Sequence, residues 1–423
     1  MSLSTRIRSI DLLRGVVMVL MAIDHIRVYA GIPAGGPDPA FFFTRWVTHF
    51  CVSGFVFFAG VSVFLYGQRT RDRRGLVKGD GAGLDTGNRK TVENGDTMGL
   101  GVGDKATLAR YLLTRGLWLV VLEMTVIRLF WAFNIHLTGF MMAGVIWMLG
   151  WCMVLMAAVI WLPLRVIGVA GLAIILFQWV FGLAPMTWTW WNFIYPVSEE
   201  APGGINVLYV VVPWIGVMMA GYGFGAFLKM EASRRDRLCR WIGLLAIGAF
   251  LVAGSVVAAR HGAGGASGQI SSGQPVSGQF SSGPPAFLSF LYRLLGQQKY
   301  PPSLLFLLMT LGPLIALMPY AERARGWLAD VLTTFGRVPL FYYILHILLI
   351  HSTALLVNWV RTGESLQGHY LTAPFCGLPE ALRWHLPLLY GVFIGLEVIL
   401  YLICRRYEQY KRMHPGNRWL KYL

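Results

Sequence analysis

The sequence predicts an all-α, polytopic membrane protein that forms a single transmembrane domain over residues 1–423. Of its 423 residues, 56% are hydrophobic and only 13% are charged, and the mean hydropathy is +0.58. Soluble domains carry about 25% charged residues. The net charge of +16 comes from basic residues that gather between the apolar stretches. That placement favours membrane orientation over nucleic-acid binding, so we expect no nucleic-acid partner.

Ten apolar stretches are long enough to cross a bilayer, which takes about 20 helical residues. Each is expected to be a helix, because a helix satisfies its own backbone hydrogen bonds in lipid. They cover residues 10–30, 45–66, 111–132, 138–161, 165–184, 205–228, 240–259, 302–320, 338–358 and 384–404. The aromatic run 186–195 is predicted to lie at the membrane interface, since Trp and Tyr favour the headgroup level.

The distribution of Lys and Arg predicts that both termini face the cytoplasm. Cytoplasmic segments of membrane proteins carry an excess of Lys and Arg. The segments that hold most of them here are 67–110, 162–165, 229–240, 321–337 and 405–423. Residues 75–106 and 262–285 are of low complexity, and we expect a mobile loop at each, the first cytoplasmic and the second on the outer side.

The first predicted helix carries ionisable residues at both ends. Such a group inside a bilayer costs roughly 2.5–3.5 kcal/mol on insertion scales and usually marks a site. Arg14 and His25 are eleven residues apart, which is three helical turns plus roughly 20°. They would therefore share one face of the helix at about 16 Å separation. One stripe of this helix could touch both ends of a buried cavity.

The outer ends of the first two helices are predicted to bring Asp24 and His25 close to Arg45 and His49. A loop of about fourteen residues joins the two helices, which favours antiparallel neighbours. A carboxylate beside an imidazole orients the ring and raises its basicity, which suits a general base or a nucleophile. We expect these four residues to be catalytic. The alternative is that they form a polar cluster at the ends of two helices without a catalytic role.

Cationic residues at the inner end are candidates for binding phosphate groups. Arg14 with Asp11, Arg115 and Arg337 could form a phosphate-binding mouth, because guanidinium groups match phosphate geometry. The alternative is that these arginines snorkel at helix ends and only set the orientation. We count His346, in the ninth predicted helix, with the donor-binding candidates. The alternative is that His346 is a hydrogen-bonded residue of the core.

Four segments resemble one family of membrane enzymes. They are Arg8-Ser-Ile-Asp-Leu-Leu-Arg-Gly15 with Ala22-Ile-Asp-His25, then Phe41-Phe-Phe-Thr-Arg-Trp-Val-Thr-His-Phe50, Gly54-Phe-Val-Phe-Phe-Ala-Gly60 and Gly336-Arg-Val-Pro-Leu-Phe-Tyr-Tyr-Ile-Leu-His346. The combination resembles the transmembrane acyltransferases, in the bacterial branch related to heparan-α-glucosaminide N-acetyltransferase.

The resemblance implies acyl transfer from cytoplasmic acyl-CoA, with acetyl-CoA as the expected donor and no metal. The acceptor would be a hydroxyl or amine of an extracytoplasmic glycan or small molecule. The expected place is the bacterial cytoplasmic membrane, with the lipid bilayer as a partner and a homodimer left open. In this family the human lysosomal enzyme has its catalytic histidine in the loop before the second helix. The matching stretch of this sequence, residues 37–41, contains no histidine. His49 or His25 would take that role.

A proton-coupled secondary transporter or flippase is the alternative function. Asp24, Glu123 and Glu397 would then be relay groups within the membrane. The sequence shows no internal repeat of helical size, which disfavours an inverted-repeat transporter.

Overall fold

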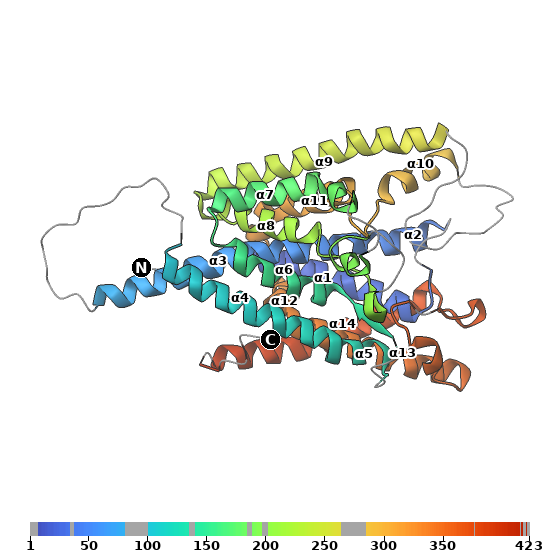
Figure 1. Ribbon diagram of the computed structural model, residues 1–423. Coiled ribbons are helices and arrows are strands. Elements are labelled where there is room, and N and C mark those ends of the chain that lie inside the picture. Colours follow the sequence, from blue (N-terminus) through green and yellow to red (C-terminus); the bar gives the residue numbers. More distant parts are fainter. Residues whose placement is uncertain are drawn as a thin grey trace, which may run out of the picture.

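Long helices run alongside one another through the computed structural model (Figure 1). The structure describes residues 7–33, 38–80, 100–134, 140–183, 188–196, 202–263, 285–375, 377–414, 416, 417 and 420. Within these ranges the chain is almost entirely helical, and the predicted all-α class is confirmed. Most of the two predicted mobile loops, residues 81–99 and 264–284, lies outside the described residues. At their described ends α3 continues to Asp80, α4 begins at Val102 and α9 continues to Ala263.

The α-helices and strands follow the chain in a simple order. The helices are α1 (Arg8–Tyr29), α2 (Pro39–Trp46), α3 (Phe50–Asp80), α4 (Val102–Leu122), α5 (Arg128–Ala132), α6 (Val145–Val159), α7 (Leu164–Leu176), α8 (Trp214–Phe224), α9 (Ala232–Ala263), α10 (Ala286–Leu295), α11 (Leu304–Arg323), α12 (Trp327–Arg337), α13 (Pro339–Thr362) and α14 (Leu386–Met413). A π-helical turn, Glu123–Ile127, joins α4 to α5. Strands β1 (Met141–Ala143) and β2 (Ile205–Val207) pair in parallel, with Met141 opposite Ile205.

Five helical stretches of the described chain are long and apolar enough to cross a membrane. They are Pro39–Asp72, Ala232–Arg260, Leu304–Arg323, Pro339–Thr362 and Leu386–Met413. The protein is therefore a multi-pass membrane protein. Helices α6 and α7 are apolar but shorter, with 15 and 13 residues. The predicted total of ten spans stays a prediction.

Two predicted spans begin later than expected. The stretch 205–228 opens with β2, and helix α8 starts only at Trp214. Pro213 directly precedes it, and a proline ring is accommodated at the start of a helix but not inside one. The stretch 138–161 likewise opens with β1, and α6 starts at Val145. The pairing of β1 with β2 uses backbone groups that a full-length helix would have satisfied internally.

Helix α12 occupies residues that were predicted to be a cytoplasmic loop, and it packs directly on α1. A Cβ atom at Gly15 would lie 1.8 Å from the carbonyl oxygen of Leu332, and one at Gly336 would lie 1.7 Å from that of Asp11. Only glycine permits this approach, in the way small residues let membrane helices come together. Helix α1 also packs against α3, α11, α13 and α14, so it lies at the centre of the bundle (Figure 1).

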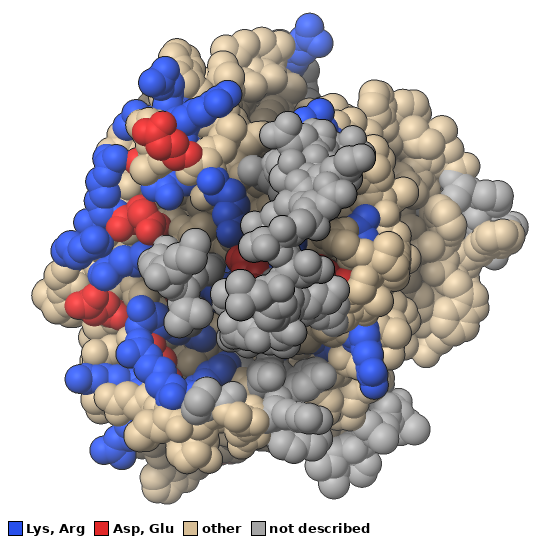
Figure 2. Space-filling view, turned by 90° about the vertical axis from the view of Figure 1, so that its left-hand side faces the viewer, with Lys and Arg blue, Asp and Glu red and all other residues tan. Residues whose placement is uncertain are grey.

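Basic side chains gather at one end of the molecule. Figure 2 shows this end, where α1 and α9 begin and α11 ends, with Lys and Arg around it. Exposed arginines there are Arg234, Arg237, Arg323, Arg325, Arg405 and Arg406. The C-terminal end of α1, with His25, lies toward the opposite end of the bundle.

Candidate functional site

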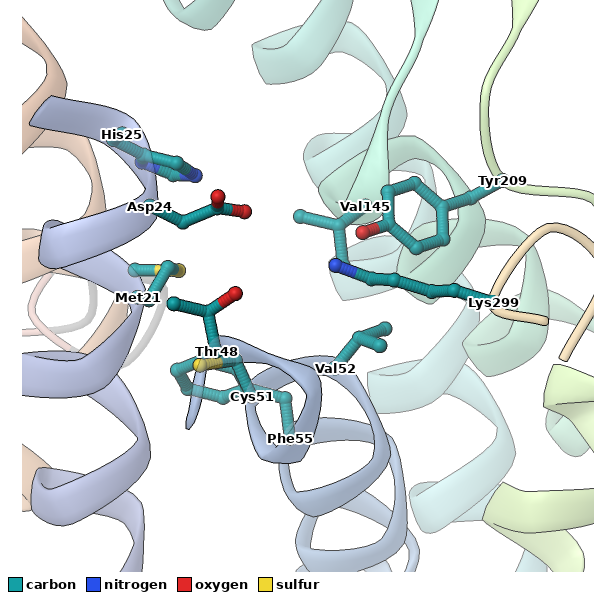
Figure 3. Close-up of a pocket in the computed structure, with 10 residues that line it drawn as sticks. All are labelled: Met21, Asp24, His25, Thr48, Cys51, Val52, Phe55, Val145, Tyr209 and Lys299. Atoms are coloured by element: carbon teal, nitrogen blue, oxygen red, sulfur yellow. The ribbon is translucent and has the colours of Figure 1, made fainter. Parts of the chain in front are cut away.

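A cavity of about 40 Å³ lies between the C-terminal part of α1 and the start of α3 (Figure 3). Its polar side chains come from four separate parts of the chain, and its floor is apolar. The lining residues are Met21, Asp24, His25, Thr48, Cys51, Val52, Phe55, Val145, Tyr209 and Lys299. Lys299 and Tyr209 reach in from one side, toward Asp24 and His25 on the other. Two of the four residues predicted to be catalytic, Asp24 and His25, therefore line this cavity.

A histidine pair fixes the proton of His25. Nδ1 of His25 lies 2.7 Å from Nε2 of His346, and Nδ1 of His346 lies 3.1 Å from the backbone carbonyl oxygen of Tyr342. A carbonyl oxygen only accepts, so Nδ1 of His346 carries a proton and its Nε2 is the acceptor in the neutral ring. His25 must then donate from Nδ1. Its Nε2 is left with an unshared pair, as a base or nucleophile requires.

Aromatic rings hold the His25 imidazole in this orientation. The Trp131 ring packs edge-on against it at 4.7 Å between centroids, and the Tyr343 ring does so at 6.3 Å. His346 is fully buried and stacks on His25 at 4.9 Å. Side chains from α5 and α13 therefore restrict this ring of α1.

Asp24 is directed to an arginine rather than to the imidazole. Its Oδ1 accepts from Nε of Arg27 at 2.9 Å, and Nη1 of Arg27 also donates to the carbonyl oxygen of Ile32 at 2.6 Å. The sequence predicted that Asp24 would orient His25. In the structure His346 is the residue hydrogen-bonded to that ring, and Asp24 contributes a negative charge beside it.

His49 lies outside the set of residues that line the cavity. Its Nδ1 donates to the carbonyl oxygen of Trp46 at 3.0 Å, and its ring packs against Phe306 at 5.5 Å. Arg45 is half-buried in the last turn of α2. Of the predicted Arg45–His49 block, the side chain that enters the cavity is that of Thr48.

The residues predicted to bind phosphate at the inner end make two separate sets of contacts. Arg14 donates from Nη2 to the carbonyl oxygen of Phe58 at 2.7 Å and to Oγ of Ser62 at 2.5 Å, both on α3. Arg337 donates to Glu408 at 2.7 Å, and its Nε lies 3.8 Å from Oδ2 of Asp11. The structure thus brings Asp11 and Arg337 together, while Arg115 is half-buried on α4. Their role in donor binding stays a prediction.

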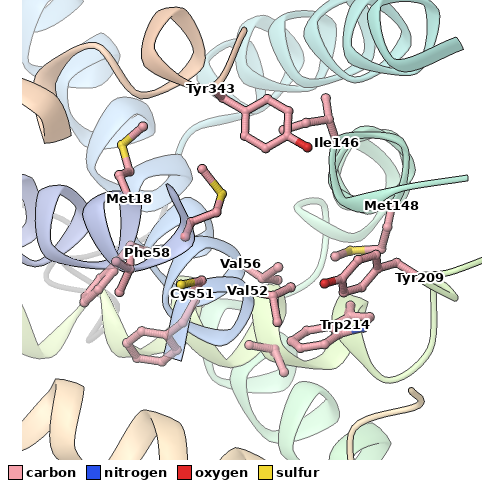
Figure 4. Close-up of a cluster of buried hydrophobic side chains, with 14 of the residues drawn as sticks. Met18, Cys51, Val52, Val56, Phe58, Ile146, Met148, Tyr209, Trp214 and Tyr343 are labelled. Carbon is pink, nitrogen blue, oxygen red and sulfur yellow. The ribbon is translucent and has the colours of Figure 1, made fainter. Parts of the chain in front are cut away.

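An apolar layer separates Arg14 from the cavity along α1. Val17, Met18 and Phe58 are completely buried in it, and Figure 4 shows Met18 and Phe58 beside Cys51 and Val52. Cys51 and Val52 also form part of the cavity floor. The stripe predicted on one face of α1 therefore contains a packed segment between its two polar ends.

Lys299 and Tyr209 are the cavity residues that sequence reasoning missed. Lys299 lies just before the predicted span 302–320, and Tyr209 falls within the predicted span 205–228. The one available signal was a lysine close to the start of an apolar stretch, in Gln298-Lys-Tyr-Pro-Pro302. That signal is weak, because a lysine at such a position is ordinarily solvated.

The buried acids of the transporter alternative lie on separate helices with separate partners. Glu123 accepts from the backbone N–H groups of Gly144, Ile146 and Trp147, which open α6. Glu397 accepts from the Tyr342 hydroxyl at 2.6 Å. These contacts give both carboxyl groups a part in helix packing. Among the described residues, no group of three or more His, Cys, Asp or Glu is placed to hold a metal ion.

A model of the family described as heparan-alpha-glucosaminide N-acetyltransferase, catalytic, matches residues 6–258, more than half of the chain. The chain belongs to this family. The resemblance predicted from the sequence is confirmed, and membership indicates a membrane acetyltransferase. A search of the curated proteins found no match. The matched part of this family member contains Asp24, His25 and Tyr209, whereas Lys299 and His346 follow it in the chain.

Proposed function

We propose that the protein transfers an acetyl group from acetyl-CoA to a hydroxyl or amine of an acceptor on the other side of the membrane, with His25 as the base. A sugar is the acceptor class that the family favours. The observation that carries this proposal is the unshared pair on Nε2 of His25. The hydrogen-bonded chain through His346 to the carbonyl of Tyr342 leaves that atom unprotonated, on a side chain that lines the cavity.

The size of the cavity suits an acetyl group. The cavity offers about 40 Å³, more than the roughly 10–15 Å³ that a single water molecule needs, so it has room for a small group of atoms. An acetyl group has three non-hydrogen atoms. The floor of Met21, Val52 and Phe55 would pack against its methyl group. A longer acyl chain would need these side chains to move.

The reaction balances with one histidine. Nε2 of His25 takes the proton of the acceptor O–H or N–H as that atom attacks the thioester carbon. The π pair of the carbonyl moves to its oxygen and returns when the C–S bond breaks, and the imidazolium then gives its proton to the sulfur. Acetyl-CoA and acceptor become acetylated acceptor and CoA. Alternatively, Nε2 attacks the carbonyl carbon itself, the C–S bond breaks and the CoA thiolate leaves. The acceptor then attacks the acetyl-imidazolium, its proton goes to that thiolate, and the neutral imidazole is the leaving group.

The donor would enter from the basic end of the molecule (Figure 2). We assign this end to the cytoplasm because basic segments stay on that side. Arg14, Arg115 and Arg337 are the proposed contacts for CoA phosphates. The pantetheine arm would then pass the layer that contains Met18, whose unbranched side chain adapts easily to a neighbour.

The test compares two histidine variants. Purified protein is incubated with acetyl-CoA labelled in the acetyl group, and the release of CoA and of label is measured. We expect His25→Ala to lose at least a hundredfold in rate, in line with the roughly 10²–10⁴ that a general base contributes. His49→Ala is the matched control and should keep most of the rate. The proposal fails if the wild type does not bind acetyl-CoA, or if His25→Ala is as active as the wild type.

A further inference from the structure

Lys299 places an ammonium group inside the cavity, across from the carboxylate of Asp24. The residue is only 7% exposed and its side chain points into the space beside Tyr209 (Figure 3). Its Nζ lies 6.0 Å from the centroid of the Tyr209 ring and 5.3 Å from that of Tyr300. The Asp24 carboxylate pairs with Arg27 at 2.9 Å and attracts the Lys299 ammonium across the cavity, without a direct ion pair to it among the described residues.

The backbone around Lys299 is held on both sides. The Tyr300 hydroxyl is hydrogen-bonded to the Tyr209 hydroxyl at 3.2 Å. Nε2 of Gln178 donates to the carbonyl oxygen of Pro302 at 3.1 Å, and the N–H of Ser303 donates to the carbonyl oxygen of Gln298 at 2.9 Å. This loop and the flanking rings of Tyr209 and Tyr300 hold the ammonium inside the cavity before any ligand arrives, which is the condition for effective electrostatic stabilisation of a transition state.

A buried ammonium is costly unless negative charge meets it. Asp24 supplies negative charge from the far side of the cavity, but its carboxylate is shared with Arg27. In the proposed reaction the oxygen of the acetyl carbonyl becomes negative when a nucleophile attacks, and Lys299 lines the cavity in which that oxygen would form.

We propose that Lys299 is a catalytic residue that stabilises the oxyanion of the tetrahedral intermediate. The ammonium keeps its proton throughout: it donates a hydrogen bond to the oxygen while that atom holds the carbonyl π pair, and the bond weakens when the pair returns and the C–S bond breaks. His25 and Lys299 thus act on the same acetyl group, one on the incoming atom and one on the oxygen. This inference rests on the proposed acetyl transfer.

The competing role for Lys299 is to bind a permanent negative charge on the acceptor. The two roles separate when the acceptor is left out, because hydrolysis of acetyl-CoA still passes through the oxyanion. The probes are CoA itself and the analogue in which the CoA sulfur carries a trifluoroacetonyl group. That ketone is strongly electrophilic and forms a tetrahedral adduct or hydrate, and the oxygen of this species resembles the oxyanion.

The experiment uses the full-length protein with Lys299→Met, Lys299→Arg and the exposed control Lys229→Met. We expect Lys299→Met to slow acceptor-free release of CoA by about 10²–10³, the usual cost of losing one oxyanion donor. Its affinity for the trifluoroacetonyl analogue should fall by a similar factor. Its affinity for CoA should stay within about threefold of the wild type, which also shows that the variant is folded. Lys299→Arg should recover part of the loss.

Two outcomes overturn the assignment of Lys299 and leave the proposed function intact. One is a Lys299→Met protein that releases CoA and binds the ketone analogue as the wild type does. The other is a variant in which only the KM of the acceptor rises, which would make Lys299 an acceptor-binding residue. A wild-type protein that binds neither CoA nor the analogue would instead refute the acetyl transfer itself.

Discussion

Removing the hydrogen-bond acceptor of His346 should impair catalysis without loosening the bundle. Nε2 of His346 accepts from Nδ1 of His25 at 2.7 Å in a fully buried position. In His346→Phe a ring still fills the space, but the N–H of His25 loses its partner. His346→Gln is the matched control, because its side-chain amide oxygen can take the position of Nε2 and accept the same hydrogen bond.

The expected loss of rate follows from the free-energy cost of leaving a buried hydrogen-bond donor unpaired. Leaving such a group without a partner costs about 1–3 kcal/mol. The imidazole avoids part of that cost by moving its proton to Nε2 or by turning, and either change removes the base. At about 1.36 kcal/mol for each factor of ten, the rate should fall roughly 5- to 150-fold. His346→Gln should lie within about fivefold of the wild type on the same scale.

The assay is steady-state release of CoA from labelled acetyl-CoA, together with the Kd for CoA and the Tm of each variant. We expect His346→Phe to lower kcat while the Kd for CoA stays unchanged, and His346→Gln to restore kcat. The reasoning is refuted if His346→Phe turns over as fast as the wild type. Equal loss in both variants, with CoA affinity lost too, would show that His346 only supports the fold.

Further predictions concern the cavity, the helix contact and the inner cluster. Val52→Phe fills the cavity floor, so acetyl turnover measured with labelled acetyl-CoA should fall more than tenfold while CoA still binds. Gly15→Ala forces a Cβ against the backbone of α12, so its Tm should drop by several degrees, whereas Gly391→Ala, with open space around it, should leave the Tm unchanged. Arg337→Ala removes the guanidinium that lies 3.8 Å from the buried carboxylate of Asp11, so the Tm should fall; a Kd for CoA that also weakens tenfold or more would support the proposed phosphate contact.

Hydropathy predicted the helical architecture because long apolar stretches have few other stable forms in lipid. It could not predict where α6 and α8 begin, because Pro213 and the pairing of β1 with β2 decide those positions locally. It also missed α12, whose glycine contact with α1 depends on a meeting of two distant segments. Packing of that kind leaves no periodic signal in either segment alone.

His25 could be found from the sequence because an imidazole within an apolar helix is unusual. Its actual partner could not, since His346 follows it by 321 positions and was equally compatible with a core role. Proximity along the chain favoured Asp24 as the orienting group, but the nearby Arg27 pairs with that carboxylate. The role of Lys299 depends on a loop that folds back into the bundle, which composition and spacing do not reveal.

The most direct test is an experimental structure of the protein with the trifluoroacetonyl analogue of acetyl-CoA bound. The account predicts that the hydroxyl of the ketone hydrate that stands in for the attacking acceptor lies within hydrogen-bond reach of Nε2 of His25, about 2.6–3.2 Å, with the other oxygen directed to Nζ of Lys299. The CoA moiety should extend toward the basic end of the bundle. A ketone group seated beside His49 and Phe306, with the cavity between His25 and Lys299 left unfilled, would contradict it.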